Sequence, residues 1–98
     1  MTINTQKNKE TVTLIIEVRL DTTTAPTLEK TINELPSDMT DLILDMTSLE
    51  YISSAGLRVL LGTQKKMNKI GSFKLTNVCD AVMEVLEMTG FADILVIE

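Results

Sequence analysis

The stretch SLEYISSAGLRVLL, residues 48–61, lies where an apolar strand gives way to a long amphipathic helix. Just before it, DLILDM at residues 41–46 is a short apolar run bracketed by aspartates, as expected for a central strand covered on both faces. From residue 54 to residue 70, apolar side chains recur at about 100° per residue, which predicts a helix. The quoted stretch therefore predicts a strand-to-helix junction of an α/β domain.

The predicted helix of residues 54–70 has an apolar side and a polar side. The apolar side gathers Gly56, Val59, Leu60, Thr63, Met67 and Ile70. The opposite side gathers Arg58, Gly62, Lys65 and Lys69. Leu57 and Leu61 fall between the two sides, so we expect them either at the margin of the core or partly exposed.

Upstream of the junction, a strand is followed by a helix. VTLIIEVRL at residues 12–20 alternates as a strand, and its inner face is predicted to hold Val12, Leu14, Ile16 and Val18. The next segment, residues 22–35, changes to helical spacing, with Thr23 or Thr24 as its cap and Pro26 in its first turn. The inner face of that helix is predicted to hold Ala25, Leu28, Ile32 and Leu35.

Downstream of the junction, Gly71 is expected to stop the long helix. SFKLTNV at residues 72–78 then alternates as a strand with Phe73 and Leu75 pointing inward. ILVI at residues 94–97 reads as a last strand.

A short helix separates these two strands. DAVMEVLEMTG at residues 80–90 has Asp80 as a candidate cap and Gly90 at its end, and its predicted buried residues are Val82, Val85 and Leu86. The whole pattern is β-α-β-α-β-α-β, with room for an edge strand around residues 1–5. It predicts one α/β domain over residues 1–98, with a four- to five-stranded mixed sheet flanked by helices.

Composition and charge narrow the functional classes. A net charge of −5 and a pI near 4.6 argue against binding nucleic acid, whose phosphates the chain would repel. Cys79 is the sole cysteine, and MTINTQKNKE at the start is too polar for a signal peptide, so we expect a cytoplasmic protein. No apolar run approaches the roughly 20 residues that cross a bilayer, so a membrane role would require a partner.

Catalytic motifs are lacking in this sequence. Without histidine, neither a Ser-His-Asp arrangement nor a Cys/His metal site is possible. The four glycines form neither a P-loop nor a G-x-G-x-x-G motif. Asp21, Asp45 and Glu50 fall at strand or loop ends, where solvated charge is the common explanation. We therefore expect no enzymatic activity, no metal and no cofactor.

The segment SSAG, residues 53–56, is the strongest functional candidate. A helix N-terminus favours an anion by about 0.3–1 kcal/mol, so a phosphoserine there would be tolerated. Its charge of roughly −1.5 to −2 would change the surface without unfolding the domain. The alternative is that Ser53 or Ser54 simply caps the helix. Gly56 and Leu57 lie three residues beyond the serines, so the capping-box partner is missing.

Three segments together carry a family resemblance: RLDTTTAPTLE, LILDMTSLEYISSAGLRVLL and VMEVLEMTGF. In this order they resemble the STAS-domain anti-sigma factor antagonists of bacteria over nearly the whole chain. The resemblance implies a small protein that binds an anti-sigma factor, itself a serine kinase, and so releases a sigma factor. Phosphorylation by that kinase would switch the protein off, and a separate serine phosphatase would restore it.

The same resemblance implies the site residues. The family motif Asp-Ser-Ser/Thr-Gly-Leu, aligned on Gly56 and Leu57, places Ser54 at the phosphoacceptor and Ser53 at the aspartate. Asp21 matches a family aspartate near the serine, with a turn role as the alternative, and Val18 stands where a glycine often occurs. The implied partner-binding residues are Asp21, Ser53, Ser54, Ala55, Gly56, Leu57, Arg58 and Leu61.

Two other functional hypotheses stay open at this point. One is a STAS subunit of a lipid-transport ABC complex, which is not phosphorylated and grips an ATPase constitutively. The other is a module that binds a small ligand or a nucleotide. A serine at the acceptor position favours the anti-sigma factor antagonist.

Overall fold

The chain is described by a computed structural model over residues 3–98. The strands are β1 (Ile3–Asn8), β2 (Thr11–Leu20), β3 (Asp41–Ile52) and β4 (Ser72–Thr76). The helices are α1 (Ala25–Asn33), α2 (Ser54–Met67) and α3 (Asp80–Met88), followed by the 3-10 turn η1 (Phe91–Asp93).

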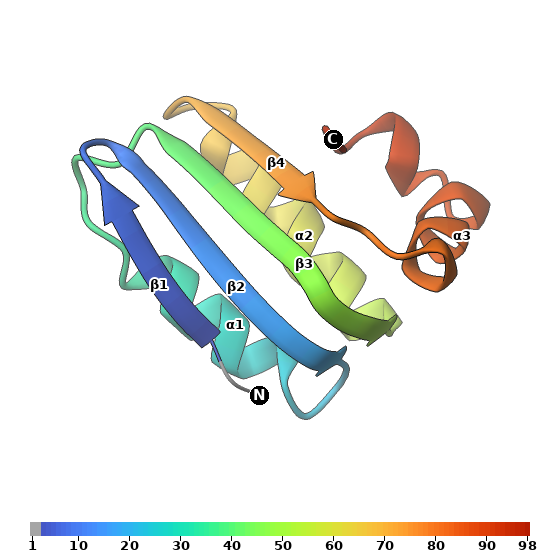
Figure 1. Cartoon of the computed structure of the whole chain (residues 1–98). Helices are drawn as coiled ribbons and strands as arrows, with labels where there is room; N and C mark the ends of the chain where they lie inside the picture. Colours follow the sequence, from blue (N-terminus) through green and yellow to red (C-terminus); the bar gives the residue numbers. More distant parts are fainter. Residues whose placement is uncertain (1–2) are drawn as a thin grey trace.

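The four strands form one mixed sheet in the order β1-β2-β3-β4 (Figure 1). β1 is antiparallel to β2, whereas β2, β3 and β4 run parallel to one another. This confirms the predicted mixed sheet and the central place of the strand that begins at Asp41. The expected edge strand is present as Ile3–Asn8, and its predicted start at residues 1–2 lies outside the described residues.

Helices α1 and α2 cover one face of the sheet, and the other face is open (Figure 1). Leu14 of β2 and Phe73 of β4 are buried on the inner face, as their alternation predicted. In β3, Leu42, Leu44 and Met46 are buried on the same face. The expectation that residues 41–46 are covered on both faces is wrong, because Ile43 and Asp45 are half-buried on the open side. A single covered face gives this alternation, whereas two covered faces bury every residue.

The second strand departs from regular alternation near its end. Its pairing with β3 shifts between Ile15 and Glu17 and again between Val18 and Arg19. Val18 adopts a positive φ of 70° and is 54% exposed, so its predicted inward position is wrong. Leu20 is buried in its place at the end of the strand. A bulge of this kind reverses the faces on which the following side chains lie.

Helices α1 and α2 bury the predicted faces with two exceptions. Thr24 is the N-cap residue of α1 and Pro26 lies in its first turn, as predicted. Leu35 is half-buried beyond the end of α1. Ile70 lies beyond α2, which ends at Met67, and is exposed rather than part of the apolar side.

Close packing requires one glycine in the first turn of α2 and another shortly after the helix. A Cβ on Gly56 would lie 2.7 Å from Cγ of Leu20 and 3.0 Å from Cγ1 of Ile52, so the first turn of α2 packs directly on β2 and β3. A Cβ on Gly71 would overlap the carbonyl of Thr40. Gly71 is therefore required where the chain passes the Thr40 carbonyl just before β4. It lies three residues after Asn68, the C-cap residue of α2.

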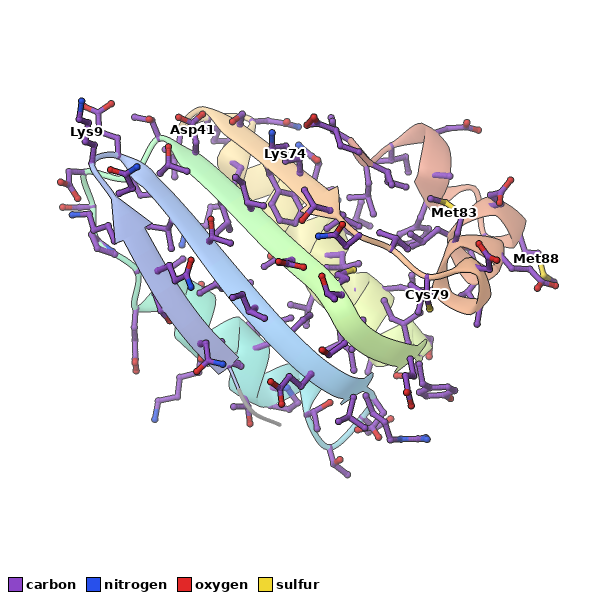
Figure 2. The ribbon with its side chains drawn as sticks, in the orientation of Figure 1. Lys9, Asp41, Lys74, Cys79, Met83 and Met88 are labelled. Atoms are coloured by element: carbon purple, nitrogen blue, oxygen red, sulfur yellow. The ribbon has the colours of Figure 1, made fainter. Side chains whose placement is uncertain are left out.

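The C-terminal part confirms a helix and corrects a strand. α3 buries Val82 and Leu86, and Gly90 follows it with a left-handed φ of 81°. Its N-cap residue is Cys79 rather than Asp80, and Val85 is half-buried. The side chain of Met88 points away from the rest of the molecule (Figure 2).

The predicted strand at residues 94–97 is wrong. Here the chain makes an isolated parallel bridge between Leu75 and Ile97. Leu75 N–H donates to Val96 C=O, and Glu98 N–H donates to Leu75 C=O, each at 2.9 Å. The N–H groups of Ile94 and Leu95 donate to Phe91 C=O within the turn, so the pairing with β4 is confined to this point.

Candidate functional site

The ends of β2 and β3 bring two chain junctions together. Leu20 pairs with Ile52, and the main-chain N–H of Ser53 donates to the carbonyl of Leu20 at 2.8 Å. The next residue after Leu20 is Asp21, which precedes α1, and the next after Ser53 is Ser54, which begins α2. The turn before α1 and the first turn of α2 therefore lie at the same edge of the sheet.

Ser54 is exposed at the first position of α2, a helix of 14 residues. Its hydroxyl is next to the first main-chain N–H groups of the helix, which have no acceptor one turn earlier within the helix. The positive end of the helix dipole lies at the same place. The site can therefore receive additional negative charge.

Ser53 occupies the N-cap position with extended backbone angles, φ −104° and ψ 176°. Its carbonyl accepts a hydrogen bond from Leu57 N–H at 2.9 Å, but its side chain makes no capping hydrogen bond. The Oγ atom is buried and has no hydrogen-bond partner among residues 3–98. Ser53 is therefore the N-cap residue of α2 by its backbone position, but its hydroxyl does not cap the helix.

The carboxylate of Asp21 organises the turn that leads into α1. Its Oδ1 accepts hydrogen bonds from Thr23 Oγ1 at 2.7 Å, Thr23 N–H at 2.9 Å and Thr24 N–H at 3.1 Å. Arg19 Nε lies 3.3 Å from Oδ2. These bonds, led by the Thr23 hydroxyl, hold the pKa of Asp21 below its ordinary value. The geometry supports the turn role for Asp21.

The remaining predicted site residues differ in how far their side chains are exposed to solvent. Arg58 is exposed, whereas Ala55 and Leu61 are half-buried. Gly56 is buried against Leu20. Leu57 is 6% exposed and belongs to the hydrophobic core, which corrects its predicted place on the partner surface. A buried side chain cannot contact a partner unless the first turn of α2 moves.

Sequence reasoning missed three neighbours of this site. Arg19 and Tyr51 are paired across β2 and β3, and the Arg19 guanidinium lies 4.2 Å from the centre of the Tyr51 ring. Tyr51 is 42% exposed, and Val18, the residue before Arg19 on β2, is 54% exposed. Regular alternation gives no signal for these positions, because the bulges in β2 decide which side chains face outward.

A second carboxylate considered for chemistry, that of Asp45, has a structural role. Asp45 Oδ1 accepts hydrogen bonds from Thr47 Oγ1 at 2.6 Å, Thr47 N–H at 3.0 Å and Asn77 Nδ2 at 3.2 Å. The Thr47 hydroxyl makes the largest contribution to lowering the pKa of Asp45. Asp45 therefore links β3 to the segment that follows β4.

Residues 3–98 contain neither a cluster of metal-binding side chains nor a helix suited to span a membrane. No group of three or more His, Cys, Asp or Glu side chains that could hold a metal ion is found in this part of the chain. Within the same residues, no helix has the length and apolar character needed to cross a membrane.

Comparison with known proteins assigns the family. The STAS domain family model matches residues 2–98. The anti-sigma-B factor antagonist of Bacillus subtilis (strain 168) is 29% identical over 94 residues, which cover 95% of this chain and 86% of that protein.

Two solved structures share the fold. An anti-sigma factor antagonist from Mycobacterium paratuberculosis has a TM-score of 0.88 and 24% identity, covering 98% of this chain and 83% of that one. The Bacillus cell fate determinant SpoIIAA in its phosphorylated form has a TM-score of 0.76 and 18% identity, covering 99% and 91%. With the family model matched over nearly the whole chain, this protein belongs to the STAS-domain family of anti-sigma factor antagonists.

Proposed function

We propose that this protein binds an anti-sigma factor that is a serine kinase, thereby releasing a sigma factor, and that phosphorylation of Ser54 ends the binding. The observation that carries the proposal is the exposed Ser54 at the start of α2, beside a Ser53 whose hydroxyl is buried. A serine phosphatase restores the active form. The role is regulatory rather than enzymatic, and its place is the cytoplasm.

Accessibility favours Ser54 over Ser53 as the phosphoacceptor. A kinase must reach the hydroxyl with the γ-phosphate of ATP in line, and Ser54 is exposed. The Oγ atom of Ser53 is buried, and the main chain of this residue is tied to Leu20 and Leu57. Phosphorylation of Ser53 would require the junction between β3 and α2 to open.

A phosphate on Ser54 acts by charge on a preformed surface. The first N–H groups of α2 are available to its oxygens, and the helix dipole favours the negative charge. Behind Ser54, the helix is anchored by Leu57, Leu60 and Met67, all buried in the core. Because none of these contacts involves the Ser54 hydroxyl, the fold does not need to change for the switch to operate.

We define the switch surface as the exposed or half-buried residues around Ser54: Arg19, Asp21, Tyr51, Ser54, Ala55, Arg58 and Leu61. Arg and Tyr are enriched among residues that dominate binding energy at protein interfaces. The pair Arg19 and Tyr51 is already stacked, which lowers the entropy lost on binding. The net charge of −5 favours a protein partner over nucleic acid.

One observation favours the alternative of a constitutive subunit in a lipid-transport ABC complex. Ser53 stands where the family motif has an aspartate, so the acceptor lacks an acidic neighbour at that position. The same switch surface would then hold an ATPase without being phosphorylated. The two functions differ in whether Ser54 ever receives phosphate.

The deciding experiment is to incubate the protein with candidate bacterial serine kinases and ATP and to measure its mass. We expect the addition of one phosphate, mapped to Ser54, and no addition in Ser54→Ala. Ser53→Ala is the matched control and should still be phosphorylated. Phosphate on Ser53 would contradict the assignment of the acceptor, and unmodified protein with every kinase tested would favour the ABC-complex function.

A further inference from the structure

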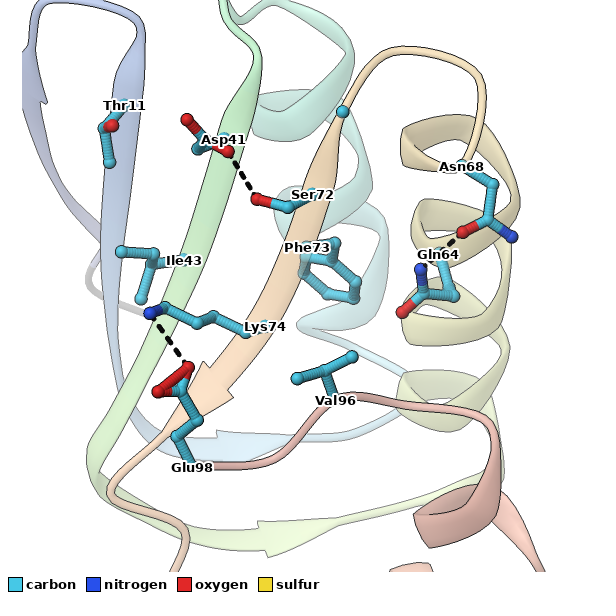
Figure 3. A pocket seen from close by; sticks show the side chains of 11 residues that line it. Thr11, Asp41, Ile43, Gln64, Asn68, Ser72, Phe73, Lys74, Val96 and Glu98 are labelled. Carbon is cyan, nitrogen blue, oxygen red and sulfur yellow. Dashed lines mark hydrogen bonds and ion pairs between the residues drawn. The ribbon is translucent and has the colours of Figure 1, made fainter.

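A groove of about 550 Å³ surrounds the outer edge of β4, on both sides of the strand (Figure 3). Gln64, Phe73 and Val96 line its inner part, and Asp41, Lys74 and Glu98 lie toward the open face of the sheet. Gln64 is ten residues after Ser54 on α2, which is about 15 Å along the helix axis. The groove is therefore separate from the switch surface, and its volume is within the range of small-molecule sites.

The side-chain amide of Gln64 provides one unsatisfied hydrogen-bonding group in this groove. Gln64 is 9% exposed, and its Nε2 donates to Asn68 Oδ1 at 2.8 Å. Its Oε1 is buried and has no hydrogen-bond partner among residues 3–98. Figure 3 shows this oxygen on the side of the amide away from Asn68, toward β4. A buried acceptor without a partner is unfavourable, so a ligand that donates to it gains affinity.

The main chain of Phe73 provides two more groups on the opposite wall. Leu75 N–H and C=O point to the outer edge of β4, because they bond to Val96 and Glu98. Main-chain groups alternate in direction along a strand, so those of Phe73 point to the same edge. The structure gives them no partner within residues 3–98. Phe73 thus presents one free donor and one free acceptor side by side, two residues before Leu75, where the C-terminal segment pairs with β4.

The length of the free edge decides between a peptide strand and a small molecule. An added strand needs several main-chain pairs along the edge. Here Leu75 is occupied by the C-terminal segment, and Gly71 N–H donates to Met67 C=O at 2.8 Å. Ser72 N–H bonds to Thr40 C=O on the inner side. In this segment only Phe73 has both its main-chain N–H and its C=O free. The edge is therefore too short for a peptide strand and suits a small molecule.

The charges at the mouth of the groove select against anions. Glu98 pairs with Lys74 at 2.9 Å, which neutralises that cation. Asp41 accepts hydrogen bonds from the hydroxyls of Ser72 and Thr40, so its carboxyl group is a second acidic group at the mouth. Gln64 Oε1 also presents negative partial charge. A neutral or cationic ligand fits this environment better than a carboxylate or phosphate.

We propose that the β4-edge groove binds a small uncharged or cationic molecule that carries a carboxamide or an amide-like N-heterocycle. Its adjacent acceptor and donor pair with the N–H and C=O of Phe73, and a further N–H donates to Gln64 Oε1. Its apolar part packs against Val96, which is 54% exposed. The site is independent of phosphorylation at Ser54.

The test uses nicotinamide as the probe and nicotinate as its anionic counterpart. In ¹H–¹⁵N spectra of the full chain, nicotinamide should cause saturable shifts of the Phe73 main-chain and Gln64 side-chain resonances. We expect a millimolar Kd for a probe of this size. Nicotinate should bind at least tenfold more weakly. This comparison requires no substitution and so cannot fail through misfolding.

A pair of variants tests the role of Gln64. Gln64→Met removes the buried acceptor at similar volume and should weaken nicotinamide binding about tenfold. Lys65→Met, on the exposed side of the same helix, should leave the Kd within about twofold. The proposal is overturned by shifts that do not saturate or that omit Phe73, by equal binding of nicotinate, or by unchanged affinity in Gln64→Met.

Discussion

The main-chain N–H of Ser53 donates to the carbonyl of Leu20 at 2.8 Å and joins the ends of β2 and β3. This bond continues the parallel ladder to the last residue of each strand, where Leu20 pairs with Ile52. It places the Asp21 turn beside the start of α2, although Asp21 and Ser53 are 32 positions apart in the sequence. The arrangement of the switch surface depends on this register.

The first prediction concerns a charge on Ser54. Ser54→Asp should keep the free energy of unfolding within about 1 kcal/mol of the wild type, the scale of an exposed charge–dipole interaction. Its affinity for the anti-sigma factor should fall at least tenfold, about 1.4 kcal/mol. Denaturant unfolding and calorimetric titration measure the two effects. Ser53→Ala is the control: it loses no capping bond, so its stability should be unchanged or higher.

The contrasting outcome for Ser54 is informative as well. If the phosphorylated protein bound its kinase as tightly as the unmodified one, charge at this position would not be the switch. The constitutive ABC-complex function would then be the better explanation.

The second prediction separates the interface from the core on α2. Leu61 is half-buried, so Leu61→Asp should weaken partner binding while lowering the melting temperature only slightly. Leu57→Asp should unfold the domain, because it buries an unpaired charge in the core. Thermal unfolding and a binding assay on both variants check this. A large loss of stability in Leu61→Asp would assign Leu61 to the core.

The third prediction compares two glycines of the same helix. Gly56→Ala should destabilise the protein by about 1–3 kcal/mol, because its Cβ would overlap Leu20. At Gly62 nothing lies within 4 Å of a Cβ, so Gly62→Ala should stabilise by about 0.5–1 kcal/mol through helix propensity. Chemical denaturation of both variants measures the difference. Equal effects would argue against the close contact between α2 and the sheet.

The fourth prediction concerns the backbone at Val18. A β-branched residue at φ 70° is strained, and its side chain is 54% exposed. Val18→Gly should therefore raise the free energy of unfolding by about 1 kcal/mol. Val18→Ala keeps a Cβ and should give a smaller gain. If glycine destabilised the protein, the side chain of Val18 would be contributing more packing than its exposure indicates.

The fifth prediction is a pH dependence that arises from Asp45. Hydrogen bonds, first from the Thr47 hydroxyl, lower its pKa from the ordinary 3.8. The ionised form therefore stabilises the fold above about pH 4, and this contribution is lost as pH falls through the lowered pKa. Asp45→Asn should be less stable than the wild type at pH 6, and the difference should shrink toward pH 2. Unfolding curves at several pH values test it, and a constant difference would exclude ionisation as the cause.

The local pattern of residues was enough to predict most elements of this protein. Helical spacing identified α1, α2 and α3, because each helix buries one continuous stripe. Alternation identified β2 and β4, and an apolar run between aspartates identified the start of β3. Three segments, one of them around Ser54, carried the family resemblance. These are properties of near neighbours in the chain, so they can be read without knowing what packs on them.

Tertiary structure decided the features that depend on a distant partner. The bulges of β2 turned Val18 outward and left Tyr51 and Arg19 stacked beside the site. One uncovered sheet face left Ile43 and Asp45 half-buried. Residues 94–97 make only an isolated bridge to β4, because Ile94 and Leu95 bond back to Phe91. Which serine hydroxyl is accessible also depends on packing, since the Ser53 and Ser54 side chains differ only in the direction that the junction imposes. Local periodicity specifies which residues can be buried, but the pairing register and the covering helices determine which of them are.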